Sequence, residues 1–183
     1  FELYYAVSCG GQVCHTVNPR LFPEQIEYIL NHAEDRWVFV DPMFVPLMEQ
    51  LQSRLPLVEG FVVLTSEELM PATDLRNCCA YESFIADQSD SFEWPDLDEN
   101  AASSLCYTSG TTGNPKGVLY SHRSTVLHSL VGALPDVMNL SVDDVVMPIV
   151  PMFHVNAWGT AYSGPMIGAK LVLPGPKMAD GET

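Results

Sequence analysis

The stretch Cys106–His122, CYTSGTTGNPKGVLYSH, gathers residues suited to binding an anion behind a short apolar segment. Its glycines let the backbone turn tightly and approach a ligand closely, and they are Gly110, Gly113 and Gly117. Small hydroxyl side chains add hydrogen-bond donors, and they are Ser109, Thr111 and Thr112. Successive backbone N–H groups in such a turn form a concave anion site. We therefore predict that this loop binds the phosphates of a nucleotide.

Lys116 brings a mobile cation to this loop in a chain that has three lysines and a formal net charge of −15. Clustered Lys and Arg would be needed for general binding to nucleic acid or to an anionic membrane surface, so both are excluded. A polyanionic ligand must instead be held by backbone N–H groups, a metal ion and very few cations.

Two common phosphate loops do not fit the stretch. A Walker A loop requires G-x-x-x-x-G-K-[ST], whereas Pro115 stands at the second glycine position and Gly117 follows the lysine. The dinucleotide fingerprint G-x-G-x-x-G is absent as well. An ordinary surface turn, in which Gly, Thr and Asn are common, is the alternative for a shorter stretch.

The first half of the chain alternates between helical and strand patterns. Residues 22–36 are predicted to form an amphipathic helix, since Pro23 suits a helix start and Ile26, Ile29 and Leu30 share one face. A strand over 37–41, a helix over 44–55 and an apolar strand over 61–66 follow. Continuous apolar strands are typical of parallel sheets buried on both faces. The order βαβ predicts an α/β fold with a mostly parallel sheet.

The second half continues the alternation after an acidic segment. Residues 66–100 are predicted to be a surface connection with one short helix near 81–86. The elements expected beyond it are strands at 103–109, 117–121, 144–151 and 169–175, and helices at 122–134 and over most of 152–168.

Cysteine content and hydropathy favour a cytoplasmic protein. The five cysteines are odd in number and show no C-x-x-C pair, which indicates reduced thiols and no zinc site. No apolar run reaches the roughly 18 residues of a membrane span. The N-terminal residues FELYYAVSCGG lack the basic region of a signal peptide and are predicted to be helical, so we expect a fragment of a longer protein.

Three stretches together resemble the adenylate-forming (AMP-binding) superfamily. YTSGTTGNPKGV at 107–118 is similar to its phosphate-binding signature, and PMFHVNAWG at 151–159 to the aromatic–histidine motif of acyl-CoA ligases. Residues 15–36 resemble an upstream segment of fatty-acyl-CoA ligases. The nearest branches are the medium- and long-chain fatty-acyl-CoA ligases and the 3-methylmercaptopropionyl-CoA ligases.

This resemblance implies two half-reactions, with ATP, Mg²⁺ and coenzyme A as co-substrates or cofactors. A carboxylic acid is activated as acyl-AMP with release of pyrophosphate, and the CoA thioester then forms. The phosphate-binding residues implied are Thr108, Ser109, Gly110, Thr111, Thr112, Gly113 and Lys116, with Lys116 assisting catalysis. Either Thr111 or Thr112 is implied as the Mg²⁺ contact, and both remain open.

The second motif implies the acyl-binding residues. His154 is expected near the acyl carboxylate and the α-phosphate, with a steering rather than a general-base role. Trp158, four residues on, is expected on the same helix face as a wall of the acyl pocket. Val155, Ala157 and Gly159 are further candidates for this pocket. A satisfied partly buried histidine and a core tryptophan are the alternatives; the remaining histidines are expected to be structural or on the surface.

The family's later motifs do not occur in these residues, since no Y-G-x-T-E segment follows. We therefore expect residues 1–183 to be part of an AMP-binding N-terminal domain, without the C-terminal lid domain, and to be inactive alone. The alternatives are an aryl-acid ligase, a peptide-synthetase adenylation domain or a non-catalytic polyphosphate-binding module. A homodimeric parent protein remains open.

Overall fold

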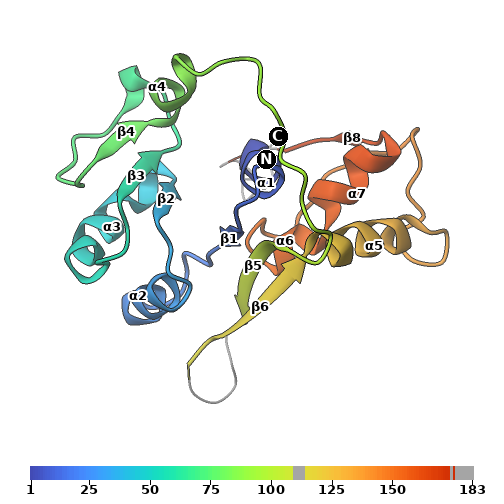
Figure 1. Ribbon diagram of the computed structural model, residues 1–183, viewed down its shortest axis with the longest axis horizontal. Coiled ribbons are helices and arrows are strands. Elements are labelled where there is room, and N and C mark those ends of the chain that lie inside the picture. The colour runs from blue at the N-terminus through green and yellow to red at the C-terminus, as the bar shows by residue number, and fades with distance from the viewer. Residues whose placement is uncertain (109–113, 174, 176–183) are drawn as a thin grey trace. The chain divides into compact units, whose positions relative to one another are not determined.

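The computed structural model describes residues 1–108, 114–173 and 175, which form two compact units (Figure 1). The first unit contains Phe1–Thr16, Trp94–Thr108 and the described part of Gly117–Thr183. The second unit is formed mainly by Val17–Glu93. The helices and strands predicted from the sequence are therefore divided between two units, each with its own sheet structure.

The second unit is built around a parallel three-stranded sheet in the order β2-β3-β4. The strands are β2 (Trp37–Val40), β3 (Gly60–Val63) and β4 (Cys78–Ala80). The helices of this unit are α2 (Pro23–His32), α3 (Val45–Leu51) and α4 (Tyr81–Ala86). Short 3₁₀ helices occupy Pro42–Phe44, Gln52–Arg54 and Glu67–Leu69. All four residues of β3 are buried, which explains its continuous apolar sequence.

Arg76 connects the segment that follows α3 to the core of this unit through hydrogen bonds and a contact with an aromatic ring. Its guanidinium donates hydrogen bonds to the carbonyl oxygens of Gln52, Leu55 (2.6 Å) and Val58 (2.8 Å). The same group stands 5.8 Å from the ring centroid of Phe61, a fully buried residue of β3. A planar group with several donors is suited to bonding several carbonyl oxygens at once, here in addition to the backbone N–H donors to the carbonyls of Gln52 and Leu55.

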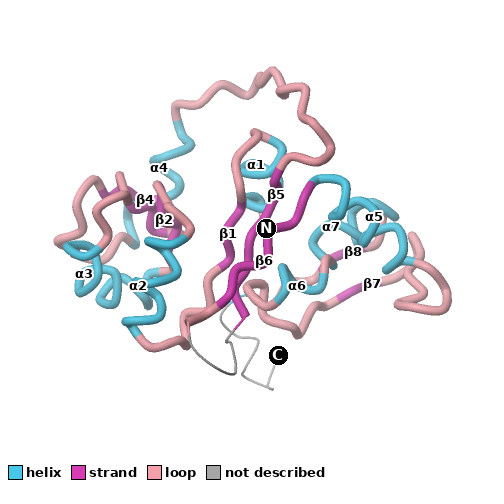
Figure 2. The backbone as a smooth tube through the Cα atoms, turned by 60° about the horizontal axis from the view of Figure 1, so that its bottom comes forward, coloured by secondary structure: helices cyan, strands magenta, loops and turns pink. Residues whose placement is uncertain are grey.

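The first unit contains a sheet in the order β1-β5-β6 and a two-stranded parallel sheet of β7 and β8 (Figure 2). The strands are β1 (Cys14–Thr16), β5 (Ala102–Thr108), β6 (Lys116–Ser121), β7 (Val145–Val146) and β8 (Lys170–Leu171). The helices are α1 (Glu2–Cys9), α5 (His122–Ala133), α6 (Val155–Trp158) and α7 (Thr160–Ile167). β1 runs parallel to β5, with Cys14 opposite Ser104 and Thr16 opposite Cys106.

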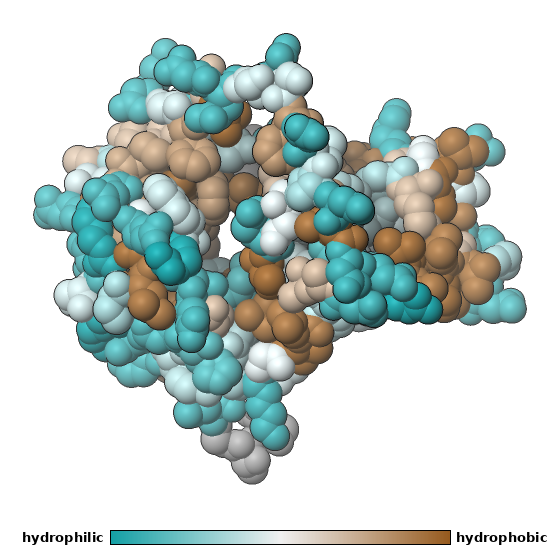
Figure 3. Space-filling model, in the orientation of Figure 1, coloured by the Kyte–Doolittle hydropathy of each residue, from teal (hydrophilic) through white to brown (hydrophobic). Residues whose placement is uncertain are grey.

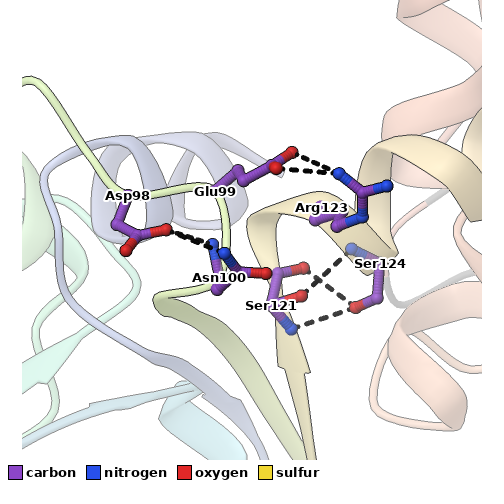
Figure 4. A network of polar contacts seen from close by, with 6 residues as sticks. All are labelled: Asp98, Glu99, Asn100, Ser121, Arg123 and Ser124. Atoms are coloured by element: carbon purple, nitrogen blue, oxygen red, sulfur yellow. Dashed lines mark hydrogen bonds and ion pairs between the residues drawn. The ribbon is translucent and has the colours of Figure 1, made fainter.

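A polar network fixes the start of α5 (Figure 4). Ser121 and Ser124 cap the helix reciprocally: Ser124 N donates to Ser121 Oγ (3.1 Å), and Ser121 N donates to Ser124 Oγ (3.0 Å). Arg123 binds both carboxylate oxygens of Glu99, at 2.7 and 2.9 Å. Because Glu99 lies just before β5 and Arg123 just after β6, this ion pair joins both ends of the strand–loop–strand segment.

Several predicted elements are confirmed and others are wrong. The helices near 22–36 and 122–134 form as α2 and α5, and the short helix near 81–86 forms as α4. The strand expected over 144–151 is limited to Val145–Val146, because Pro148 and Pro151 have no backbone N–H to donate to a ladder. The short strands β1 and β4 were not predicted.

The surface of the described residues shows two contrasting regions. Residues 82–100 before β5 are exposed along nearly their whole length, as predicted. The prediction that 66–100 is a surface connection with one short helix is wrong for its first part, which contains a 3₁₀ helix, the sheet strand β4 and the buried residues Leu75 and Ala80. Apolar side chains are exposed along α5, namely Val126, Leu127, Leu130, Val131 and Leu134, and Figure 3 shows hydrophobic atoms gathered over α5 and α7. Among the described helices, none is both long enough and apolar enough to cross a membrane.

Candidate active site

Two adjacent strands of the first unit carry the ends of the glycine loop. β5 ends at Thr108 and β6 begins at Lys116, and both side chains are exposed. The predicted phosphate-binding residues Ser109, Gly110, Thr111, Thr112 and Gly113 lie outside the described residues. Thr108 and Lys116 remain candidates for binding a polyphosphate, since a hydroxyl donates a hydrogen bond and an ammonium group supplies positive charge.

Gly117 allows β6 to pass close to β5 next to the loop. A Cβ atom added at Gly117 would lie 3.1 Å from Cζ of Tyr107 and 3.3 Å from Cδ1 of Leu105. Ser103 Oγ donates to the carbonyl oxygen of Tyr120 at 3.2 Å, which gives a second cross-strand contact. These contacts fix where the loop leaves β5 and returns to β6.

Residues 155–159 form a left-handed turn rather than the start of a right-handed helix. Val155, Asn156, Ala157 and Trp158 have φ values between 48° and 55°, and Gly159 has φ 72°. The prediction that Trp158 shares a helix face with His154 is therefore wrong, because the spacing of four residues brings side chains together only in a right-handed helix. Each non-glycine residue in this conformation costs about 1 kcal/mol. A β-branched residue such as Val155 is especially rare there.

The turn divides its residues into two groups. His154, Val155 and Trp158 are exposed, and Trp158 keeps 55% of its surface. Asn156, Ala157 and Gly159 are buried, with Ala157 at 0% exposure. The structure thus presents three of the predicted acyl-binding residues to solvent and places Gly159 and Ala157 beneath them.

Polar groups of several elements hold the turn. Asn156 Nδ2 donates to Ser104 Oγ of β5 at 3.1 Å, and Thr16 Oγ1 of β1 donates to Asn156 Oδ1 at 2.8 Å. The Trp158 carbonyl oxygen lies 3.2 Å from Nε2 of His128 on α5. Thr160 Oγ1 donates to the carbonyl oxygen of Ala157 at 2.7 Å. The left-handed conformation is thus held by contacts with four other elements of the first unit, β1, β5, α5 and α7.

Two thiols of the first unit, those of Cys14 and Cys106, are buried. Burial raises the pKa of the Cys106 thiol, against the opposing effect of hydrogen bonds with Tyr120 and the Val155 backbone. Burial also raises the pKa of Cys14 from its ordinary value of 9.0 to about 11. Both thiols are consequently protonated at neutral pH and serve as small apolar side chains rather than nucleophiles.

An open pocket of about 350 Å³ lies elsewhere in the first unit, among α1, α5 and α7. Tyr5, Val126, Tyr162 and Met166 are among its lining residues. Neither His154 nor Trp158 lines it, so this pocket is separate from the predicted acyl-binding residues.

The described residues were also considered as metal ligands. Within residues 1–108, 114–173 and 175, no three His, Cys, Asp or Glu side chains are grouped as they would be around a metal ion. The two candidate Mg²⁺ contacts, Thr111 and Thr112, lie in the undescribed part of the loop. Of the residues predicted to bind phosphate, Thr108 and Lys116 lie within the described part of the chain.

Sequence reasoning missed the residues that support the turn. Thr16, Ser104 and Asn156 were not singled out, and His128 was assigned to a structural or surface role. One feature of the sequence could have indicated the left-handed turn. Asn156 stands between the candidate acyl-binding residues, and asparagine adopts the left-handed conformation more readily than most residues. The bonds it makes join residues as much as 140 positions apart.

Two curated relatives are similar over nearly the whole chain. The medium-chain-fatty-acid–CoA ligase of Ectopseudomonas oleovorans is 59% identical over 177 residues, which are 97% of this chain and 32% of the relative. The 3-methylmercaptopropionyl-CoA ligase of Ruegeria pomeroyi is 57% identical over 177 residues, 97% of this chain and 33% of the relative. The chain thus spans about a third of the length of these proteins.

A solved structure and a family model agree with these relatives. The crystal structure of an anthranilate CoA ligase in complex with anthranoyl-AMP matches with a TM-score of 0.77 and 25% identity, covering 94% of this chain and 32% of that one. The mixed α/β architecture matches the N-terminal domains of adenylate-forming enzymes. The family described as "AMP-binding enzyme" matches residues 1–182. The chain belongs to the AMP-binding enzyme family, on the branch that holds the fatty-acid–CoA and 3-methylmercaptopropionyl-CoA ligases.

Proposed function

We propose that this chain is the phosphate-binding part of an AMP-forming acid–thiol ligase that converts a fatty or related carboxylic acid into its CoA thioester. The observation that carries the proposal is structural. β5 leads directly into the glycine loop, and the same strand holds the turn that exposes His154 and Trp158. The candidate triphosphate site and the candidate acyl site are therefore both attached to β5.

In the first half-reaction a carboxylate oxygen of the acid attacks the α-phosphorus of ATP. The bond from that phosphorus to the bridging oxygen breaks, and pyrophosphate leaves with the electron pair. Such displacements depend on positioning and on neutralising the departing charge. In a chain of net charge −15, the loop amides and Lys116 supply that neutralisation.

His154 has a different part in this proposal. Its imidazole is exposed at the start of the turn, and its backbone N–H donates to the carbonyl oxygen of Pro151 at 2.8 Å. A carboxylic acid is already ionised at neutral pH and needs no general base. His154 therefore orients the carboxylate by donating a hydrogen bond, and Trp158 and Val155 contact the acyl chain beside it.

In the second half-reaction the thiol of coenzyme A attacks the acyl carbonyl carbon, and AMP leaves. The thioester bond replaces the mixed anhydride, and the thiol proton is released. The described residues include none that we assign to this step.

The test uses the full-length protein that contains these residues. Exchange of labelled pyrophosphate into ATP is measured with carboxylates from propionate to palmitate and with anthranilate, followed by AMP release with CoA. We expect exchange that depends on an aliphatic acid and AMP release that requires CoA. Exchange with anthranilate alone would favour an aryl-acid ligase. Exchange with none of these acids, or release of ADP, would contradict the proposal.

A further inference from the structure

We infer that Asn156 is a positioning residue, which locks the left-handed turn onto β1 and β5 and thereby sets the placement of His154 relative to the phosphate loop. The catalytic consequence rests on the proposed function, whereas the locking itself does not. Asn156 is 5% exposed and does not face the predicted ligand side of the turn. Its effect on the reaction is therefore indirect.

The side-chain amide of Asn156 uses both of its polar atoms. Its nitrogen donates to Ser104 Oγ (3.1 Å), and its oxygen accepts from Thr16 Oγ1 (2.8 Å). Ser104 is 1% exposed, so the bond lies where water cannot readily replace it. The Thr16 hydroxyl also lies 3.2 Å from the carbonyl oxygen of Phe153, the residue before His154. Asn156 thus joins the turn to two strands, and Thr16 contacts the chain on both sides of the exposed histidine.

Backbone conformation makes this locking necessary. Four consecutive non-glycine residues with positive φ are unfavourable in isolation, and such strain persists only where the surroundings determine it. Asn156 occupies the second position of the turn, between the exposed Val155 and the buried Ala157. Loss of its two hydrogen bonds would free the turn to relax toward ordinary conformations and would move His154.

The geometry also explains why the placement bears on phosphate chemistry. Ser104 lies in β5, four residues before Thr108, where that strand ends at the loop. α6 lies beside β5 (Figure 1). A mutation far from the reacting atoms that displaces a catalytic group by about 1 Å can lower the rate about a hundredfold. Fixing the turn to β5 therefore keeps the candidate acyl site in register with the candidate triphosphate site.

Two substitutions of Asn156 distinguish a role in holding the turn from a role in stabilising the whole fold. Asn156→Gly keeps a residue that accepts positive φ but removes both side-chain hydrogen bonds. Asn156→Asp keeps the shape and the acceptor but removes the donor to Ser104. Asn139→Gly is the matched control, because Asn139 also has positive φ (50°) but is exposed.

The first experiment measures backbone amide hydrogen exchange in the full-length protein and needs no activity. Peptides over 152–162 should exchange at least about tenfold faster in Asn156→Gly and Asn156→Asp, while peptides over β3 and the Asn139→Gly protein stay unchanged. Unchanged protection of 152–162 in both Asn156 variants would overturn the inference. Equal loss of protection over β3 would also overturn it, since Asn156 would then support the whole fold.

The second experiment measures carboxylate-dependent pyrophosphate exchange. Asn156→Gly should lower kcat about tenfold or more with the KM for ATP changed less than about twofold, because His154 and not the phosphate loop has moved. In a His154→Ala background the same substitution should change kcat less than about twofold. If Asn156→Gly lowers kcat in the His154→Ala background by the same factor as in the wild type, the positioning role is overturned. A wild-type protein with no exchange activity would refute the proposed function, and the first experiment would still decide on the locking.

Discussion

The imidazole ring of His128 lies directly against the backbone of Gly159. A Cβ atom added at Gly159 would stand 2.6 Å from Cδ2 of His128, closer than any real contact of that kind. Gly159 also has φ 72°, a conformation that side chains with a Cβ atom rarely adopt. The last residue of the left-handed turn is thus required to be glycine for two separate reasons, one conformational and one steric.

Gly159→Ala tests both reasons in a double-mutant cycle with His128→Ala. In the wild-type background we expect the alanine to lower the free energy of unfolding by about 2–3 kcal/mol, from the steric overlap and the positive φ together. In the His128→Ala background only the conformational part of about 1 kcal/mol should remain. Denaturant unfolding of the four proteins measures the difference. Equal losses in both backgrounds would show that His128 does not restrict this position.

Arg76 should contribute much more to stability than an exposed arginine of the same unit. Arg76→Ala removes three hydrogen bonds to carbonyl oxygens, of which those of Gln52 and Leu55 keep a backbone N–H donor, and we expect a loss of about 2 kcal/mol. Arg36→Ala is the matched control, since the Arg36–Glu59 pair is 63% and 48% exposed, and its loss should be below about 0.5 kcal/mol. Thermal unfolding of both variants checks the ranking, and a reversed order would contradict it.

The thiol of Cys14 should resist alkylation in the native protein. Its pKa is raised to about 11 by burial, so the reactive thiolate appears only as the pH rises through that value. At pH 9 we expect labelling by iodoacetamide to be at least about 50-fold slower than for a thiol with the ordinary pKa. Mass spectrometry of native and urea-unfolded protein gives the comparison. Labelling at equal rates in the two states would contradict the burial of Cys14.

The sign of this pKa shift also fixes a pH dependence of stability. The thiol is easier to ionise in the unfolded chain than in the folded one, so its contribution is complete below pH 9 and is lost as the pH rises toward about 11. Substitution of Cys14 by alanine should therefore flatten the alkaline decline in the unfolding free energy. If the free energy of unfolding of the alanine variant falls with pH as steeply as that of the wild type, groups other than Cys14 cause the decline.

His154→Ala should impair use of the carboxylic acid and leave nucleotide binding intact. The side chain is exposed at the start of the turn, and its proposed partner is the carboxylate of the acid. We expect kcat/KM for the acid to fall about tenfold or more, with the affinity for ATP within about twofold of wild type. Steady-state kinetics with each substrate varied in turn separates the two. Equal losses for acid and ATP would contradict the assignment of His154 to the acyl side.

The elements that could be predicted from sequence are those with a long or continuous pattern. α2 and α5 have caps and sufficient length, and β3 is apolar at every buried position. β4 has three residues, too few for any periodicity to be recognised. The loop residues predicted to bind phosphate remain predictions, because 109–113 lie outside the described part of the chain.

The left-handed turn could not be predicted, for a physical reason. A hydrophobic pattern reports which residues are buried but not the hand of the backbone, and right-handed helices are the default. Here the hand is imposed from outside, by Thr16, Ser104 and His128. Those partners lie between 30 and 140 positions away along the chain, so no local window of the sequence contains them.

The central claim is that the segment between β5 and β6 binds the triphosphate of ATP. Isothermal titration of ATP into the full-length protein tests it most directly, with Lys116→Ala and Gly113→Val as the variants. Lys170→Ala is the control, since Lys170 is an exposed lysine of β8. We expect each of the two loop variants to weaken ATP binding about tenfold or more, and the control to leave it unchanged. Wild-type affinity in both loop variants would contradict the account.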